Sequence, residues 1–206
     1  MKISLQNAGK RYNREWIFRG LSTELEAGES YALLGPNGSG KSTLLKALSS
    51  YLRLSEGSIA YREGSREVDP EQVAPRIGFS APYMELIEEL SVSEHLFFHQ
   101  RFKPFIEGLD VESCLAYLGF ERHRDKAVKS LSSGMKQRLK LMLAIGSRSR
   151  ILLLDEPATN LDSGGVSWYH RLLSHYRNGR TLVIASNRKD EYVMCKHYIQ
   201  MEDYKV

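Results

Sequence analysis

The sequence predicts an α/β fold with a mainly parallel sheet, an antiparallel β part near the N-terminus and a helical segment in the middle. Two observations carry this prediction. Continuous apolar runs of strand length at 151–154 and 181–185 are separated by a helical segment at about 163–176, which is typical of a parallel sheet covered on both faces. From about 85 to 150, apolar residues instead repeat at helical spacing.

The first part of the chain is expected to be mostly β. Residues 3–7 alternate, 16–25 and 31–34 are further candidate strands, and 58–61 with 66–68 have the pattern of a hairpin around Glu63-Gly64. One helix is expected between these strands, ending near 55–57. Its apolar positions, which would pack one face on the sheet, are Leu44, Leu45, Leu48 and Leu52.

Three helices are expected in the middle segment. Ser91 and Glu94 form the sequence of a capping box, in which the serine side chain accepts a backbone N–H and the glutamate reaches back. A second helix is predicted over 111–118. A third begins near Ser133, and its buried candidates are Leu139, Met142, Leu143 and Ile145.

Composition sets broad limits. A chain of 206 residues with 42% hydrophobic side chains can bury one sizeable core with a smaller lobe. The net charge of +4 suits anionic partners such as nucleotides, nucleic acids or lipids, and suits an ordinary solvated surface equally well. The two cysteines have no metal spacing and are too few for a disulfide framework, which favours a reducing compartment. No signal peptide or run of about 20 apolar residues is found, so a role in transport requires a separate membrane partner.

A glycine-rich segment, GPNGSGKS, follows the apolar run 31–34 and opens the predicted helix. Strand, glycine loop and helix in this order are the context of a phosphate cradle, because successive backbone N–H groups can converge on phosphate oxygens at a helix N-terminus. Lys41 would reach the β- and γ-phosphates, the Ser42 hydroxyl would bind Mg²⁺, and Thr43 would contact the α-phosphate side. The predicted ATP-binding residues here are Gly35, Pro36, Asn37, Gly38, Ser39, Gly40, Lys41, Ser42 and Thr43.

The apolar run at 151–154 ends in two carboxylates, Asp155 and Glu156. Open α/β sheets hold ligands at the C-terminal ends of their strands, so Asp155 is expected to bind Mg²⁺ directly or through water. Glu156 suits a base for the water that attacks the γ-phosphate. An acidic pair after a strand is also a common turn or helix cap, and the cradle upstream favours the catalytic interpretation.

Across essentially its whole length the sequence resembles the ATP-binding cassette (ABC) ATPases. The most specific element is LSSGMKQR at 131–138, similar to the family's LSGGQ signature and placed a helix's length before the strand that ends in Asp155. ATNLD at 158–162 resembles the family's D-loop, with Asp162 at its end. Tyr12 falls where the family has an aromatic residue that stacks on adenine, although Trp16 or Phe18 could be mistaken for it.

The resemblance implies a single ABC domain on a P-loop NTPase core. Residues 1–81 and 151–206 would form the β-rich, RecA-like core, and about 82–150 a helical subdomain that ends in the signature helix. ATP held on the cradle of one subunit would be contacted by the signature of a second subunit, identical or different, through the Ser132 side chain and the Gly134 N–H. The signature residues carried over are Ser132, Ser133, Gly134 and Met135.

Four positions depart from the family pattern. Pro82 stands where the family has a glutamine that contacts Mg²⁺ and the attacking water, and Asn187 stands where the family has a catalytic histidine. Proline has no side-chain hydrogen bond, whereas the shorter asparagine amide can still donate to a phosphate. In the signature, Ser133 replaces a glycine and Met135 a glutamine. We therefore expect ATP hydrolysis with Glu156, Lys41 and Asn187 as catalytic residues, at a slow rate.

Three functions agree with this interpretation. The first is the ATP-hydrolysing subunit of a membrane transporter, cytoplasmic and bound to the inner face of the membrane through an integral membrane subunit, without direct nucleic-acid contact. The second is a soluble ABC ATPase, although such proteins generally add a coiled coil, zinc-binding cysteines or a second cassette. The third is an ATP-dependent clamp with negligible hydrolysis. The aromatic residues near Pro82 could form a groove for the membrane subunit or fill the core, and these are Phe79, Tyr83, Phe97, Phe98, Phe102 and Phe105.

Overall fold

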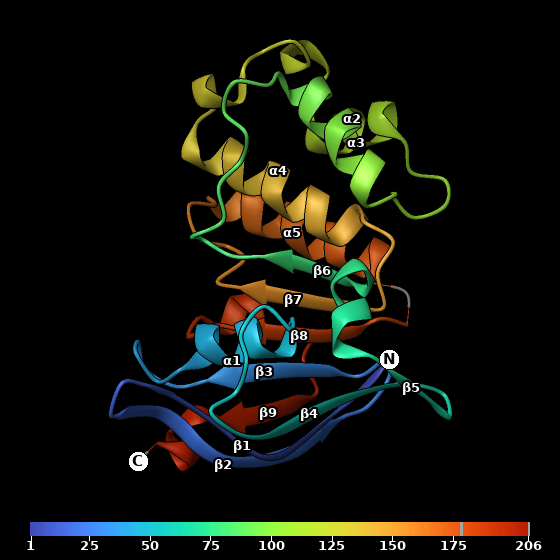
Figure 1. Ribbon diagram of the computed structural model, residues 1–206. Coiled ribbons are helices and arrows are strands. Elements are labelled where there is room, and N and C mark those ends of the chain that lie inside the picture. The colour runs from blue at the N-terminus through green and yellow to red at the C-terminus, as the bar shows by residue number, and fades with distance from the viewer. Residues whose placement is uncertain (178, 206) are drawn as a thin grey trace. The chain divides into compact units, whose positions relative to one another are not determined.

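The computed structural model describes residues 1–177 and 179–205. These residues divide into two compact units, each drawn in Figure 1. The β unit comprises residues 1–77, 150–156 and 179–205, and the helical unit comprises 78–149 and 157–177. The chain passes from the first unit to the second along strand β6 (Ile77–Ser80). The α/β class predicted from the sequence is confirmed.

An antiparallel sheet forms one part of the β unit. Its strands are β1 (Lys2–Tyr12), β2 (Glu15–Leu25), β4 (Glu56–Glu63) and β5 (Arg66–Val68), in the order β2-β1-β4-β5. The predicted antiparallel part and hairpin are therefore confirmed, although β1 is longer than the predicted 3–7. Several apolar side chains of β1 and β2 are buried, among them Ile3, Phe18 and Leu21, which are fully buried.

A parallel sheet forms the second layer of the β unit. The strands β3 (Ser30–Leu34), β7 (Ile151–Asp155), β8 (Thr181–Ala185) and β9 (His197–Gln200) run in the order β7-β8-β3-β9, and each neighbouring pair is parallel. Every residue of β7 and β8 is buried, which explains their unbroken apolar sequences. The carboxyl ends of β3 and β7 consequently open toward the same edge of the sheet.

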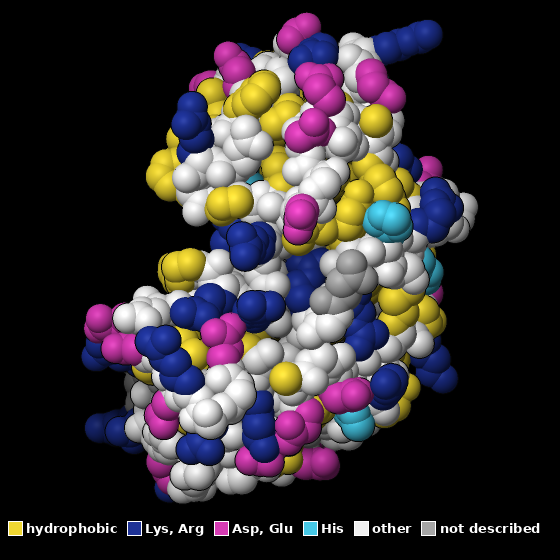
Figure 2. All heavy atoms as spheres, turned by 90° about the vertical axis from the view of Figure 1, so that its right-hand side faces the viewer, with side chains coloured by type: hydrophobic (Ala, Val, Ile, Leu, Met, Phe, Trp, Pro, Cys, Tyr) yellow, Lys and Arg dark blue, Asp and Glu magenta, His cyan; other side chains and the backbone are white. Residues whose placement is uncertain are grey.

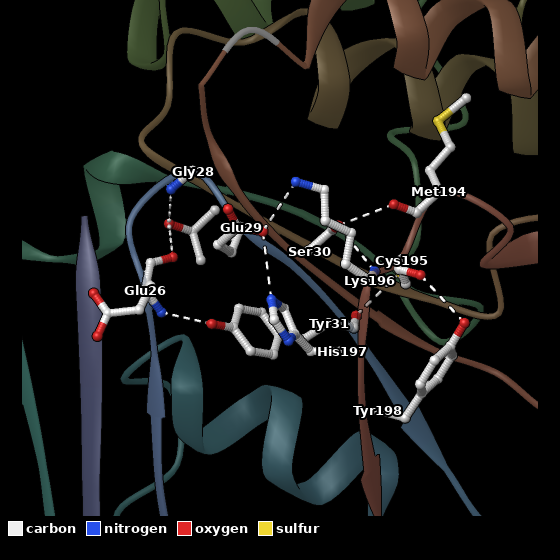
Figure 3. Close-up of polar contacts among 11 residues, drawn as sticks. Glu26, Gly28, Glu29, Ser30, Tyr31, Met194, Cys195, Lys196, His197 and Tyr198 are labelled. Carbon is white, nitrogen blue, oxygen red and sulfur yellow. Dashed lines mark hydrogen bonds and ion pairs between the residues drawn. The ribbon is translucent and has the colours of Figure 1, made fainter.

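Strand β9 was not predicted, because three of its four residues are exposed and its sequence lacks an apolar run. Polar contacts hold it beside β3, as Figure 3 shows. Glu29 Oε2 lies 3.4 Å from both Lys196 Nζ and His197 Nε2, and the His197 ring stacks on Tyr31 with a centroid separation of 4.9 Å. Ser30 Oγ donates a hydrogen bond to the Met194 carbonyl.

Helix α1 (Lys41–Leu48) packs against β7 and β8 with Leu44, Leu45 and Leu48 buried. The prediction that this helix continues to 55–57 with Leu52 on its apolar face is wrong. Ser50 adopts a left-handed conformation (φ 61°) that ends the helix, and the Tyr61 hydroxyl donates a 3.0 Å hydrogen bond to the terminal Leu48 carbonyl.

The helical unit contains α2 (Val92–Phe102), α3 (Val111–Leu118), α4 (Ser133–Gly146) and α5 (Ser163–Tyr176). The capping box of Ser91 and Glu94 is present, and all four predicted core residues of α4 are buried. No helix among the described residues has the length and apolar character needed to cross a membrane.

Both units also contain short 3₁₀ turns. In the β unit they cover Pro70–Gln72, Ala74–Arg76, Lys189–Glu191 and Met201–Tyr204, and in the helical unit they cover Glu121–His123 and Val128–Ser130.

Candidate functional site

The glycine loop joins β3 to α1 and leaves the start of the helix open. Gly40 occupies the N-cap position with φ 97°, and no side chain caps the helix, so the first N–H groups of α1 have no partner within the helix. A Cβ at Gly40 would lie 2.9 Å from Ile17 Cγ2, and the left-handed φ excludes other residues as well. The loop is therefore built to present backbone N–H groups and a helix N-terminus to an anion.

A cavity of about 310 Å³ lies over this loop. Its lining comprises Ile17, Asn37, Gly38, Gly40, Lys41, Ser42, Thr43 and Glu156. The remaining predicted loop residues shape the cradle rather than line the cavity. The Gly35 backbone (φ 139°) passes so close to Ser39 that a Cβ would lie 2.7 Å from its hydroxyl, and Pro36 O accepts the Ser39 N–H.

The ammonium of Lys41 folds back across the loop. Lys41 Nζ donates hydrogen bonds to the carbonyls of Gly35 at 2.6 Å and Pro36 at 3.1 Å, and the residue is only 5% exposed. Burial lowers the pKa of Lys41, while Glu156 and Asp155 act in the opposite direction. A buried ammonium held by two neutral carbonyls is well placed to pair with an anion in the cavity.

Asp155 lies at the C-terminal end of β7 and is 2% exposed. Burial raises the pKa of the Asp155 carboxyl, and a hydrogen bond from Ser42 offsets part of this increase. The structure thus brings together the two residues predicted to bind a metal. A carboxylate and a hydroxyl are hard oxygen ligands, which suit Mg²⁺ when the nucleotide and water supply the rest. The residues present fit that ion.

Glu156 leaves the strand in a left-handed conformation with φ 44°. Its backbone N–H donates to the Ala185 carbonyl at 2.9 Å, which ties the turn to the neighbouring strand β8. The side chain lines the same cavity as Lys41 and Ser42. A non-glycine residue with positive φ is uncommon and costs stability, so the geometry holds this carboxylate at the cradle at the expense of backbone strain.

Asn187 follows β8, and the structure places it at the glycine loop. Its Nδ2 donates a 3.0 Å hydrogen bond to Asn37 Oδ1, and both side chains are exposed. The segment after Asn187 is fixed by Arg188, whose guanidinium donates to Asp190 at 2.6 Å. Asn187 was predicted as a site residue from the resemblance, but its hydrogen-bond partner Asn37 was not predicted.

The three aromatic candidates for base stacking differ sharply in exposure. Phe18 is fully buried and offers no face to a ligand. Tyr12 is 48% exposed at the end of β1, with Lys10 Nζ 5.2 Å from its ring centroid. The guanidinium carbons of Arg19 and Arg11 lie 4.7 and 5.5 Å from the centroid of the Trp16 ring. Tyr12 consequently retains the most accessible ring of the three.

The signature segment opens helix α4 of the helical unit. Ser132 is the N-cap, and its hydroxyl accepts the Met135 N–H at 3.3 Å. A Cβ at Gly134 would lie 2.9 Å from the Asn160 carbonyl oxygen, so α4 and the 158–162 segment are in close contact there. Ser132 and Ser133 are exposed, and Gly134 and Met135 are half-buried. The helix N-terminus with its serine therefore faces solvent.

Two further contacts join the signature helix to the 157–162 segment. Gln137 is 3% exposed and donates through Nε2 to the Pro157 carbonyl at 2.8 Å. Asp162 caps α5 by accepting the Gly165 N–H at 2.7 Å, and it lies 3.9 Å from Arg138. Asp162 thus has a structural role as a helix cap. Gln137 was not predicted, although a buried glutamine one turn into a signature helix is a signal for such a contact.

Pro82 lies in the exposed loop after β6, and its carbonyl accepts a 3.2 Å hydrogen bond from Lys140 of α4. This position therefore offers a backbone acceptor instead of a side-chain amide. The contact was not predicted, because the expectation for Pro82 concerned only the side-chain amide that proline lacks.

The fold and the cradle together define a nucleotide-binding protein of the P-loop class.

Comparisons with known proteins agree with this class. A family model described as ABC transporter matches residues 18–159. The chain is 31% identical over 202 residues to the uncharacterized ABC transporter ATP-binding protein YybJ of Bacillus subtilis, covering 97% of this chain and 92% of that protein. It is 34% identical over 177 residues to the cytochrome c biogenesis ATP-binding export protein CcmA of Paramagnetospirillum magneticum, covering 84% and 82%.

A solved structure extends the comparison to the fold. The dimeric structure of the bacterial ABC transporter cassette MJ0796 superposes with a TM-score of 0.80 at 23% identity, covering 97% of this chain and 94% of that one. The chain belongs to the ABC transporter family and is a nucleotide-binding domain of that family.

Proposed function

We propose that this chain is the subunit that binds and hydrolyses ATP, dimerises on ATP and drives conformational change in a membrane transporter. The observation that carries the proposal is the cavity over the glycine loop, where a buried lysine ammonium and Glu156 meet an open helix N-terminus. These groups recognise a polyphosphate by charge and by backbone N–H donors. Membership of the ABC transporter family supports ATP as that ligand.

In this proposal the residues from Gly35 to Thr43 hold the phosphates, and Lys41 exchanges its carbonyl partners for the β- and γ-phosphate oxygens. Ser42 and Asp155 would hold Mg²⁺, which would neutralise charge on the phosphates. Tyr12 stacks on adenine. Glu156 accepts a proton from the attacking water, and Asn187 donates its amide N–H to the γ-phosphate after release from Asn37.

We expect hydrolysis to be slow. Pro82 supplies no side chain to orient the water, and the Asn187 amide carries no positive charge, unlike a histidine that is protonated. These two losses favour, as a second candidate, a clamp that holds ATP for long periods. The presence of Glu156 at the cavity favours turnover.

A second subunit would complete the site. Ser132 and the N-terminus of α4 are exposed to solvent. We propose that they contact the γ-phosphate of an ATP molecule bound by an opposing chain. Asp162 belongs to the same contact region. MJ0796, whose fold is similar, is described as dimeric, which supports this arrangement.

The membrane partner is proposed to bind the helical unit. Phe97, Phe98 and Phe102 of α2 are 50%, 45% and 75% exposed, and Tyr83 is 46% exposed, whereas Phe105 is buried at 8%. Figure 2 shows hydrophobic side chains between charged ones on the visible face of this unit. Aromatic side chains left in solvent favour a protein surface that is covered in the working assembly. The relatives' names, which refer to transport and export, support a transporter subunit.

The catalytic part is tested by steady-state ATP turnover of the purified chain. We expect a slow basal rate that Glu156→Gln lowers about 10²-fold or more, as removal of a general base does. Lys41→Ala should abolish ATP binding in an equilibrium assay. A variant with unchanged ATP affinity would contradict the role of the cradle. A rapid basal rate would contradict the predicted slowness.

The membrane part is tested by photo-crosslinking in cells that express the chain. A photoreactive phenylalanine at Phe102 should crosslink to an integral membrane protein that resists alkaline extraction of the membranes. The control is the same group at Tyr51, which is 83% exposed in the β unit. Equal crosslinking from both positions, or none from Phe102, would refute the proposed docking surface.

A further inference from the structure

Tyr12, the residue proposed to stack on adenine, has a lysine ammonium over its ring. Lys10 stands two residues earlier on β1, and side chains two residues apart on a strand share one face of the sheet. Lys10 Nζ lies 5.2 Å from the centroid of the Tyr12 ring. The tyrosine remains 48% exposed, so the ammonium leaves part of the ring open to solvent.

The ammonium of Lys10 is itself anchored. Lys10 Nζ donates a 2.9 Å hydrogen bond to the Arg53 carbonyl, in the segment that follows α1. The backbone of β1 is tied to the same segment, because the Ser55 N–H donates to the Gly9 carbonyl at 2.8 Å and Ser55 Oγ accepts the Arg11 N–H at 3.2 Å. The ammonium is therefore held between an aromatic ring and a carbonyl whose position is fixed.

The β1–β2 hairpin carries this pair to the glycine loop. Between Lys10 and Arg11 the pairing with β2 is irregular and skips Ile17. A bulge of this kind redirects a side chain, and Ile17 lines the cavity over the loop. A Cβ at Gly40 would lie 2.9 Å from Ile17 Cγ2, so the hairpin and the cradle are in close contact within the β unit.

An exposed tyrosine ring near the tip of a hairpin can rotate about its side-chain bonds. Stacking on a base fixes the ring and costs conformational entropy, which lowers the affinity for the nucleotide. An ammonium over one face attracts the ring through its π electrons and restricts this rotation before the nucleotide binds. The opposite face then stays available for a planar base.

We propose that Lys10 is a positioning residue for the nucleotide base. Its ammonium, anchored on the Arg53 carbonyl, holds the Tyr12 ring in the orientation that stacks on adenine. Lys10 acts only through the ring, so the binding of the phosphates by the cradle does not depend on it. This inference rests on the proposed function, because it specifies how the same site binds the base of ATP.

The test compares ATP with tripolyphosphate, which has three linked phosphates and no base. Each is titrated with Mg²⁺ into the natural chain and into Lys10→Gln by calorimetry, in about 0.3 M salt to screen long-range charge effects. Lys10→Gln should weaken ATP binding about threefold, as loss of an exposed cation–π contact does, and leave tripolyphosphate binding unchanged. Lys10→Arg retains a cation and should keep the natural affinity for ATP.

A double-mutant cycle shows whether Lys10 acts through the ring. Tyr12→Ala should weaken ATP but not tripolyphosphate, and Lys10→Gln added to it should have no further effect. Lys10→Met, which keeps an unbranched side chain without the charge, repeats the measurement independently. The matched control is Arg66→Gln, which removes a positive charge from an exposed position of β5 in the same sheet and should change neither affinity.

Three outcomes would overturn the inference. Lys10→Gln could leave the ATP affinity unchanged, weaken ATP and tripolyphosphate equally, or weaken ATP by the same factor in the Tyr12→Ala chain. Each result would show that Lys10 does not position the ring for the base. Failure of the proposed function gives a different result, because the natural chain would then bind neither ATP nor tripolyphosphate, and both proposals would be wrong.

Discussion

At the scale of single residues, Asp155 shows how the site conflicts with stability. Its carboxylate is almost completely buried at the end of β7, and burial raises its pKa. The raised pKa means that the folded chain disfavours the charged form more than the unfolded chain does. Burial of this charge therefore lowers the stability of the folded protein, and Ser42, Lys41 and Lys46 offset the cost in part.

We expect Asp155→Asn to stabilise the nucleotide-free protein. The folded pKa lies above the ordinary value of 3.8, so stability falls as the pH rises through the interval between them, and the penalty is complete above that interval. The substitution should raise the unfolding midpoint at pH 7.5 by about 2–4 °C, the shift that 1 kcal/mol produces in a domain of this size. Differential scanning calorimetry measures this.

The control for this substitution is Asp125→Asn, which changes an exposed aspartate and should leave the midpoint unchanged. Asp155→Asn should also remove the extra stability that ATP with Mg²⁺ gives the natural chain. A lower midpoint in the absence of nucleotide would contradict the proposed cost of burying Asp155.

At the scale of elements, regular spacing made most helices and strands predictable. The fully buried strands β7 and β8 agree with their predicted bounds within about one residue, and the predicted capping box is present at the start of α2, because burial and capping leave strong local signals. Strand β9 is held by ion pairs and a ring stack with residues about 165 positions away, which no local pattern reveals. The end of α1 depends on one left-handed serine, and serine has no strong preference for that conformation.

The residues of the site also divide into those that local sequence patterns predict and those that depend on long-range contacts. The order of strand, glycine loop and helix predicted that Lys41 and Ser42 lie close to the carboxylates, because parallel strands end at one edge of the sheet. Contacts between residues far apart in the sequence were not predicted. The pairing of Asn187 with Asn37 depends on tertiary packing, and so does the contact of Gln137 with Pro157, for which the sequence gives only a weak signal.

The contact between α4 and the 158–162 segment leads to a test of the signature helix. Gly134→Ala places a methyl group 2.9 Å from the Asn160 carbonyl oxygen, so the backbone must shift. We expect the free energy of unfolding to fall by about 1–3 kcal/mol, as overpacking does. Urea denaturation measures the change.

Gly164→Ala is the matched control, because Gly164 also lies in the first turn of a helix. Its added Cβ would meet Asp162 Oδ1 at an ordinary 3.6 Å, and alanine favours helices, so stability should hold or rise. If both substitutions destabilised the protein equally, the close approach at Gly134 would not be its cause.

At the scale of the whole molecule, the cradle and the signature serine belong to different compact units of one chain. In the proposed arrangement, a site composed of two chains would make assembly depend on the shared phosphate, so that ATP would promote the pair and its hydrolysis would release it. Phosphoryl transfer needs mainly positioning and charge neutralisation, which such a closing interface can supply.

The dimer is tested with Glu156→Gln, which should bind ATP without consuming it. Light scattering with saturating ATP and Mg²⁺ should give twice the mass found with ADP. The double variant Lys41→Ala/Glu156→Gln, which lacks the cradle lysine, should remain a monomer under both conditions. A monomeric Glu156→Gln protein at saturating ATP would show that the signature role is wrong or that the native pair contains a different second subunit.

The neutral amide pair of Asn187 and Asn37 has a consequence for how the protein responds to acid. An imidazole in this place would change charge when a cell's interior becomes mildly acidic, and the catalytic step would change with it. Two amides exchange no protons in that range. This position would therefore keep the same hydrogen-bonding character during acid stress.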